Sequence, residues 1–137
     1  MLGLSAVQLH GQEDADHVRA LVRRLPHECE IWKALAVSKS RPENFDAADR
    51  LLFDSGSGGT GRTFDWNLVK RHGRLKDSVI AGGIGPANAR EAIALGAFAI
   101  DAGSALDARP GVKSPQKTRA LFDALRPQSR QELRLCA

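Results

Sequence analysis

Residues 51–66 read LLFDSGSGGTGRTFDW, and this stretch decides the fold class because it joins a strand, a glycine-rich loop and a helix start. Residues 51–53 form a short apolar run, which is typical of a strand buried on both faces. Asp54 ends that run, and Asp65 is placed to cap a helix that begins near Trp66. An acid at the carboxyl end of a buried strand indicates a ligand site in a parallel α/β fold.

The glycines of this loop have two interpretations. Glycine lets backbone N–H groups approach an oxyanion closely, which suits a phosphate, but it is also common in loops that bind nothing. The loop is not a P-loop, since no Gly-Lys-Ser/Thr sequence follows. Asp54 is likewise either a cap for the next turn or a chemical group. Its position directly after the buried run favours a functional site.

Composition narrows the class of protein. The 137 residues suffice for one domain with a core, and neither a membrane span nor a signal peptide is apparent, so we expect a cytoplasmic protein. The net charge of +4 is dispersed, which suits a small anionic ligand better than nucleic acid. Cys29 and Cys136 lie far apart, which argues against a zinc site. Cys29 is expected to be a small apolar residue before a strand.

The hydrophobic pattern alternates between strands and helices, which predicts parallel strands joined by right-handed crossovers. At about 25 residues per unit the chain holds five units, whereas a complete barrel has eight. We expect one domain over residues 1–126 and a polar, disordered tail over residues 127–137. The predicted strands are residues 6–9, 31–37, 50–54, 79–81 and 97–100, and the predicted helices are 12–25, 66–72, 86–94 and 115–125, with a loop or short helix over 38–49.

Polar residues or glycines fall at or near the carboxyl end of each predicted strand. Parallel strands place these ends on one side of the sheet, so we expect them to form the rim of a site. Taken singly, each has an ordinary structural interpretation as a cap, a core residue or a tight turn. The residues are His10, Gly11, Lys33, Asp54, Gly82, Gly83, Asp101 and Ser104.

A phosphate subsite is predicted where the last two strands end. Gly82 and Gly83 precede Pro86, which fits the first turn of a helix, and N–H groups at a helix start favour a phosphate. Gly103 and Ser104 would complete this subsite from the neighbouring strand. An acid beside a phosphate would repel it, so Asp101 is expected to accept a hydrogen bond from a sugar hydroxyl.

Five segments together resemble phosphoribosylanthranilate isomerase of tryptophan biosynthesis. They are VQLHG (residues 7–11), WKAL (32–35), LLFDSGSGGTGRTFDW (51–66), IAGGIGPANA (80–89) and DAGSALDARPGVK (101–113), in the family's order. The match covers about residues 6–126 and is most similar to isomerases fused to indole-glycerol-phosphate synthase. It implies α/β architecture as part of a (βα)8 TIM barrel, strands four to eight, without the first three βα units.

The resemblance also implies a reaction, an Amadori rearrangement of N-(5-phosphoribosyl)anthranilate that needs neither metal nor cofactor. By resemblance Asp54 is the general acid that protonates the ribose ring oxygen, a role that needs a raised pKa. The remaining residues are implied to bind the substrate and its phosphate. They are Gln8, His10, Gly58, Gly59, Gly82, Gly83, Asp101, Gly103 and Ser104.

Two family residues have no counterpart here, namely the cysteine base after the first barrel strand and an arginine after the second. We therefore expect the chain alone to be inactive or nearly so. A five-stranded piece of a barrel also exposes strand edges. The piece would curl into an open sheet, self-associate, or pair with a chain carrying the first three strands. The other classes that remain are a binding module for a phosphorylated ligand and a truncated remnant.

Overall fold

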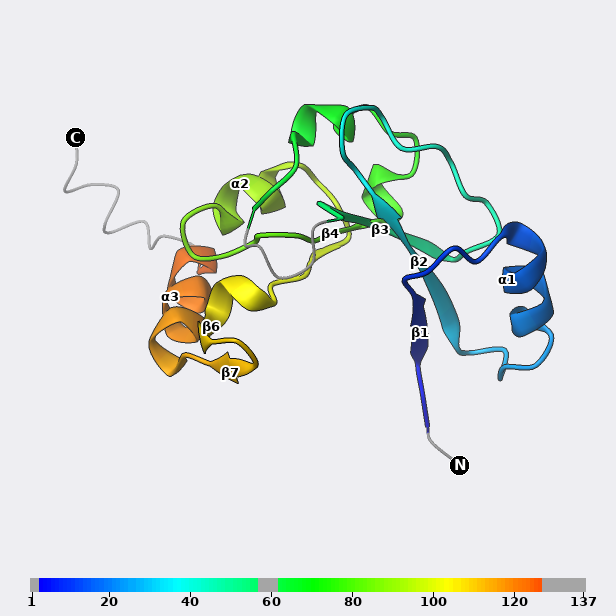
Figure 1. Cartoon of the computed structure of the whole chain (residues 1–137), viewed down its shortest axis with the longest axis horizontal. Coiled ribbons are helices and arrows are strands. Elements are labelled where there is room, and N and C mark those ends of the chain that lie inside the picture. Colours follow the sequence, from blue (N-terminus) through cyan, green and yellow to red (C-terminus); the bar gives the residue numbers. More distant parts are fainter. Residues whose placement is uncertain (1–2, 57–61, 127–137) are drawn as a thin grey trace.

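The framework of the protein is a single parallel sheet of five strands, and Figure 1 shows its place in the chain. A computed structural model describes residues 3–56 and 62–126. The strand order is β1-β2-β3-β4-β5, the same as the order along the chain. The sheet strands are β1 (Ala6–Leu9), β2 (Glu30–Ala36), β3 (Arg50–Asp54), β4 (Val79–Ile80) and β5 (Ala99–Ile100).

Three α-helices and a hairpin complete the described fold. The helices are α1 (Ala15–Val22), α2 (Ala89–Ala94) and α3 (Pro115–Leu125), and the antiparallel hairpin consists of β6 (Asp107–Arg109) and β7 (Val112–Lys113). Short 3-10 helices cover Trp66–Leu68, Leu75–Asp77 and Ser104–Leu106. None of the described helices has the length and apolar character needed to cross a membrane.

The two faces of the sheet have different neighbours. Leu51 and Phe53 pack into the largest apolar cluster, which includes Ala92 of α2 and Leu121 of α3. We call this side the helix-covered face. Leu52, between them, packs instead into a smaller cluster drawn mainly from strands, and we call that side the inner face. The members of the inner cluster are Ala34, Leu52, Val79 and Ala81, with Trp32 and Ala99 packed against them.

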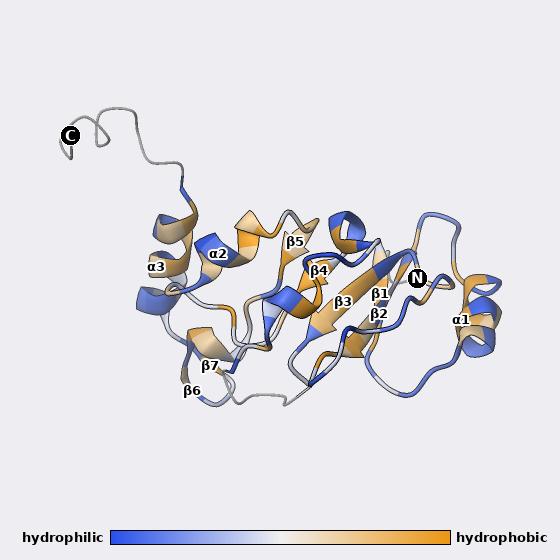
Figure 2. Ribbon diagram, turned by 90° about the horizontal axis from the view of Figure 1, so that it is seen from above, coloured by the Kyte–Doolittle hydropathy of each residue, from blue (hydrophilic) through white to orange (hydrophobic). Residues whose placement is uncertain are grey.

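Burial on both faces explains why β3 reads as a continuous apolar run. Leu51 and Phe53 are fully buried and Leu52 is nearly so, as expected for a central strand of a parallel sheet. Figure 2 shows this strand coloured as largely hydrophobic at the middle of the sheet. Within the described residues β1 and β5 each pair with one neighbour only, so the sheet has two open edges.

Several sequence predictions hold at the level of whole elements. The strands predicted over 6–9 and 50–54 and the helix over 115–125 are observed with those bounds. The strand predicted over 31–37 is shifted by one residue, and those over 79–81 and 97–100 are shorter. Residues 38–49 form a loop. Cys29 is buried just before β2, as predicted. The polar tail, residues 127–137, lies outside the described residues.

The predicted helices over 12–25, 66–72 and 86–94 were too long. Helix α1 begins at Ala15 because Asp14, and not an earlier residue, accepts the capping bond from the His17 N–H at 2.8 Å. Helix α2 begins at Ala89, so Pro86 lies in a preceding turn and not in the first helical turn. The predicted helix at Trp66 is one turn of 3-10 helix capped by Asp65.

The hairpin of β6 and β7 was not predicted. It surrounds Pro110 and Gly111, and Gly111 has φ of +76°, a left-handed conformation that suits glycine. Its two strands are only three and two residues long. A hairpin this short has no clear alternation of apolar and polar residues, so the pattern indicated only a loop.

His72 is a buried titratable residue that packs against β3, the central strand. Its ring packs edge-on against Phe53, with ring centroids 5.0 Å apart, and its Nδ1 accepts a hydrogen bond from the Arg74 N–H at 3.2 Å. Burial, followed by the nearby charge of Arg41, lowers the pKa of His72, while a backbone hydrogen bond at Glu43 opposes the shift. The folded state therefore favours the neutral ring.

We predict that His72 makes the fold less stable as the pH falls from 7 to 5. The unfolded chain takes up the proton at a higher pH than the folded chain, so acid favours unfolding. His72→Gln should flatten this part of the stability profile, measured by urea unfolding at a series of pH values. His17→Gln, at an exposed position of α1, is the control and should keep the original slope. Equal slopes in all three proteins would contradict the prediction.

Candidate active site

Alternation along the strands brings four of the predicted site residues to the inner face. Gln8 is in register with Trp32, which packs against the inner cluster, and His10 follows two residues later. Asp54 and Asp101 also stand two residues after members of that group. The carboxyl ends of parallel strands share one edge of the sheet. These side chains therefore belong to the same edge and the same face.

His10 and Asp54 meet directly across this edge. His10 Nε2 lies 3.6 Å from Asp54 Oδ2, although the strands that carry them are separated by β2. The Gln8 amide nitrogen lies 3.2 Å from His10 Nδ1. An amide nitrogen only donates, so Nδ1 accepts this bond, and the neutral ring then carries its proton on Nε2, facing Asp54. The Asp54 side chain is 15% exposed, whereas that of His10 is 58% exposed.

Gly82 lies against Asp54 and has a left-handed backbone conformation, which favours glycine. Its φ is +77°, and a Cβ added at this position would be 2.5 Å from Asp54 Oδ1 and 2.7 Å from the Ser55 backbone nitrogen. The Ser55 hydroxyl donates to the same Asp54 oxygen at 3.3 Å. Gly82 was predicted as a phosphate residue, but its first structural consequence is to leave room for the Asp54 carboxylate.

The loop after β4 is ordered by the Asn88 side chain. Asn88 Oδ1 accepts from the Gly85 N–H at 2.8 Å, and Nδ2 donates to the Gly83 carbonyl at 3.0 Å. The N–H groups of Asn88 and Ala89 donate to the Gly85 carbonyl. The N–H groups of Gly85, Asn88 and Ala89 are therefore bonded within the turn. No acceptor among the described residues bonds to the N–H groups of Gly82 and Gly83.

The second part of the predicted phosphate subsite follows β5. The Asp101 N–H donates to the Ile80 carbonyl at 2.8 Å, which continues the pairing of β5 with β4. Gly103 and Ser104 come next and are exposed. Lys113 of β7 donates both to the Gly103 carbonyl at 3.0 Å and to Asp107 Oδ1 at 2.5 Å. The hairpin thus braces the backbone at Gly103.

The glycine-rich loop after β3 is described only in part. Gly56 has φ of +72°, and a Cβ there would lie 2.9 Å from the Ala36 Cβ, so glycine is needed at this close approach. Gly58 and Gly59, which were predicted to help bind a phosphate, lie outside the described residues.

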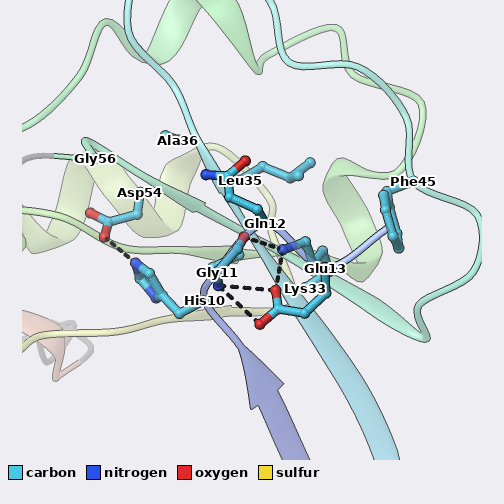
Figure 3. Close-up of a pocket in the computed structure, with 11 residues that line it drawn as sticks. His10, Gly11, Gln12, Glu13, Lys33, Leu35, Ala36, Phe45, Asp54 and Gly56 are labelled. Atoms are coloured by element: carbon cyan, nitrogen blue, oxygen red, sulfur yellow. Dashed lines mark hydrogen bonds and ion pairs between the residues drawn. The ribbon is translucent and has the colours of Figure 1, made fainter. Parts of the chain in front are cut away.

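A cavity of about 460 Å³ opens beside His10 and Asp54 (Figure 3). Its other walls come from the loop that follows β1, from β2 and from Phe45. Lys33, predicted as part of the rim, lies on the opposite face from Asp54, because its register partner is Leu51 of the helix-covered cluster. Its ammonium reaches the loop after β1 and donates to the Gly11 carbonyl and to Glu13 Oε2, each at 2.7 Å.

Two carboxyl groups near this edge, those of Glu13 and Asp107, have lowered pKa values with identifiable causes. The hydrogen bond from Lys33 is the main cause that lowers the pKa of Glu13 to about 2. A hydrogen bond from Lys113 likewise lowers the pKa of Asp107. Both carboxylates are therefore charged at neutral pH and serve to hold backbone in place. Among residues 3–56 and 62–126 no group of three or more His, Cys, Asp or Glu side chains could hold a metal.

The sequence interpretation missed the residues that support the site. Glu13 lies within the helix predicted over residues 12–25, but it precedes α1 and binds Lys33 and the Gly11 N–H. The available signal was a lysine inside the apolar run of β2, because a buried lysine requires a partner. Asn88, three residues after Gly85, has a spacing typical of side chains that bond to a nearby backbone.

The fold and the site together define a segment of a parallel βα barrel with its polar groups at the carboxyl ends of the strands. The family described as N-(5'-phosphoribosyl)anthranilate isomerase matches residues 1–124, and the chain belongs to this family. Two similar proteins, each described as tryptophan biosynthesis protein TrpCF, come from Yersinia pestis and Vibrio parahaemolyticus. They are 44% and 43% identical to the chain, each over 91% of its length.

Solved structures support the same assignment. Phosphoribosyl anthranilate isomerase from Thermus thermophilus is 32% identical, with a TM-score of 0.75 over 89% of the chain. A phosphoribosyl anthranilate isomerase in complex with reduced 1-(o-carboxyphenylamino)-1-deoxyribulose 5-phosphate is 30% identical, with a TM-score of 0.66. A structure of monomers generated from the dimeric enzyme of Thermotoga maritima is 31% identical, with a TM-score of 0.68. The chain is therefore of the TIM-barrel type.

The chain spans only part of each relative. It covers 26% of the length of the proteins from Yersinia pestis and Vibrio parahaemolyticus. It covers 60% of the Thermus thermophilus structure and 59% of the complex.

We predict that Gly82→Ala destabilises the protein by more than about 1–2 kcal/mol, which is the cost of a left-handed residue alone. The added methyl group would also meet Asp54 and the Ser55 backbone, which have little freedom to move. Gly73→Ala is the control, because its Cβ would meet nothing within 4 Å. Urea unfolding measures both variants. A Gly82→Ala protein as stable as the control would contradict the close packing described here.

Proposed function

We propose that this chain supplies the general acid and the phosphate site of a phosphoribosylanthranilate isomerase, as strands four to eight of its barrel. The reaction opens the ribose ring of N-(5-phosphoribosyl)anthranilate and yields the carboxyphenylamino-deoxyribulose phosphate. The observation that carries the proposal is Asp54, which ends β3 on the inner face with His10 Nε2 3.6 Å from its carboxylate. The family match over residues 1–124 supports it.

Asp54 is the proposed general acid. The ribose ring oxygen must receive a proton as its bond to the anomeric carbon breaks, and the donor must lie within hydrogen-bond reach of that oxygen. Asp54 lines the cavity of about 460 Å³ and is mostly buried, so a sugar ring held there would be close to its carboxyl group. The Ser55 hydroxyl and the space left by Gly82 fix the direction of this side chain.

The substrate phosphate is proposed to bind where β4 and β5 end. Gly82 and Gly83 follow β4, and their N–H groups have no acceptor among the described residues. Gly103 and Ser104 follow β5, the strand that pairs with β4. Backbone N–H groups that approach from two adjacent loops are well suited to a phosphate. Gly58 and Gly59 are proposed to contribute from the loop after β3.

The sugar and the aromatic ring are assigned to the side chains of the inner face. Gln8 and His10 would line the pocket beside Asp54, with His10 offering the Nε2 proton to a substrate oxygen. Asp101, exposed at the end of β5, would accept a hydrogen bond from a ribose hydroxyl. No metal or cofactor takes part in this proposal.

The base that removes the proton from the sugar carbon is proposed to come from another polypeptide segment. In the family it is a cysteine after the first barrel strand, and no position of this sequence matches it. Cys29 is buried directly before β2, at the amino end of that strand, whereas the candidate site lies at the carboxyl ends of the strands. A segment that carries barrel strands one to three would pair with an open edge of the sheet, at β1 or β5. Because the substrate is a water-soluble phosphate ester, we propose a cytoplasmic setting.

We predict that the chain alone has no isomerase activity and that activity appears when it is mixed with the first three βα units of the Thermus thermophilus enzyme. The added segment would supply the base and complete the barrel. Loss of anthranilate fluorescence follows the reaction. Activity of the chain without the added segment would contradict the assignment of the base to another segment.

In the active mixture, Asp54→Asn should lower kcat by about 10² to 10⁴, the usual contribution of a general acid. Phosphate affinity, measured by calorimetry with inorganic phosphate, should change little. The matched control is Asp16→Asn, which replaces an exposed acid on α1 that forms an ion pair with Arg19 and should retain full activity. A mixture in which the Asp54→Asn chain is as active as the native chain would rule out Asp54 as the acid. A mixture that binds phosphate but never converts the substrate would indicate that the chain is a binding module.

A further inference from the structure

Both peptide groups of Gly11 are bound by one partly buried ion pair, between Lys33 and Glu13. The Gly11 N–H donates to Glu13 Oε1 and Oε2, at 3.2 and 3.0 Å. The Gly11 carbonyl accepts from Lys33 Nζ at 2.7 Å, and the same ammonium lies 2.7 Å from Glu13 Oε2. Figure 3 shows the three residues in contact at the wall of the cavity. A single residue is thus held on both sides of its Cα atom.

Removing the charged groups of Lys33 and Glu13 from water costs free energy. The Lys33 side chain is 5% exposed and that of Glu13 is 23% exposed. A lysine so deeply buried must be compensated by a charged partner and by hydrogen bonds, and such pairs often stabilise a fold no better than apolar residues do. Stability alone therefore does not explain why a lysine occupies this buried position. What the pair does provide is a fixed geometry for the loop that follows β1.

The identity of residue 11 agrees with this role. A Cβ at Gly11 would lie 2.8 Å from Glu13 Oε1 and 3.3 Å from its Cδ. A side chain at residue 11 would therefore require the carboxylate end of Glu13 to move from its place against the backbone. The loop after β1 is thus adapted to the pair by its own sequence as well as by Lys33.

The group that this geometry positions is His10. It directly precedes Gly11, and its Nε2 lies 3.6 Å from Asp54 Oδ2. Because β1 is an edge strand that is paired with β2 alone among the described strands, no second strand of this sheet restrains its carboxyl end. Lys33 belongs to β2, where it stands in register with Leu9, the last residue of β1. The ion pair therefore ties the free end of β1 to the interior of the sheet.

We propose that Lys33 and Glu13 are positioning residues that hold Gly11 so that the His10 ring stays beside Asp54. The inference rests on the proposed function for its catalytic meaning, but the placement of His10 is independent of it. Lys33 and Glu13 line the same cavity as Asp54, but their hydrogen bonds and ion pair go to each other and to Gly11, and none goes to Asp54. They act through the backbone of Gly11.

The first test observes the His10 ring in the chain itself. In a protein with ¹⁵N-labelled histidine, the His10 Nε2 resonance should shift in Asp54→Asn, because that variant replaces the neighbouring carboxyl group with an amide. Lys33→Met keeps the length of the side chain and removes its charge and hydrogen bonds. It should move the same resonance in the same direction, because the ring leaves Asp54. Lys33→Arg should restore part of the native shift.

Val18→Ala is the control for a purely structural role. Val18 is fully buried on α1 and packs in the same cluster as Ile31 of β2, but it has no hydrogen bond to Gly11. This variant should lower the urea midpoint and leave the His10 resonance in place. The inference is overturned if Lys33→Met leaves the resonance at its native position, or if Val18→Ala moves it as far.

The second test uses the active mixture described above. Lys33→Met should lower kcat by about tenfold to a hundredfold, in line with the cost of misplacing a group by about 1 Å, while KM changes by less than about threefold. A larger rise in KM with an unchanged kcat would contradict a role beside the acid. If the native mixture is inactive, the proposed function fails, and the resonance of His10 alone still decides the positioning role.

Discussion

The pairing of β3 with a neighbour on each side is the constraint on which the site depends. The pairing extends past the ends of the strands, since the Val37 N–H donates to the Asp54 carbonyl and the Ala81 N–H to the Phe53 carbonyl, both at 2.8 Å. These bonds fix the backbone at Asp54 and, one residue after Ala81, at Gly82. The carboxylate and the glycine that makes room for it are therefore placed by the same ladder. An acid at the end of an edge strand would lack this support.

Much of the fold could be predicted because the strands of a parallel sheet have a local signature. The apolar run before Asp54 is buried on both faces, and Pro115 and Gly96 lie at a helix start and just beyond a helix end, as their backbone preferences require. The limits of α1 and α2 were less predictable. Helix α1 starts where Asp14 caps it, while the neighbouring Glu13 bonds to Lys33, twenty residues later. Helix α2 starts only after the turn that the Asn88 side chain closes.

The candidate site was predictable in its location but not in its internal organisation. Strand alternation already places His10 and Asp54 at one edge, but no sequence pattern shows that their side chains lie 3.6 Å apart across an intervening strand. The partner of Lys33 is twenty residues earlier in the chain, and the role of Asn88 depends on the turn that it closes. Such partnerships exist only after the chain has folded. The roles assigned to Asp54 and the glycines remain predictions.

The strand order also has a consequence for folding and for the origin of such proteins. Because each strand pairs with the next one along the chain, no sheet contact requires closing a loop longer than one βα unit. The sheet therefore has a low contact order for a parallel structure and can grow by adding one unit at a time. The backbone N–H and C=O groups at the two open edges of the sheet are of the same kind as those that pair inside it. Further βα units that are joined to the chain by gene fusion or duplication can therefore pair with an existing sheet edge.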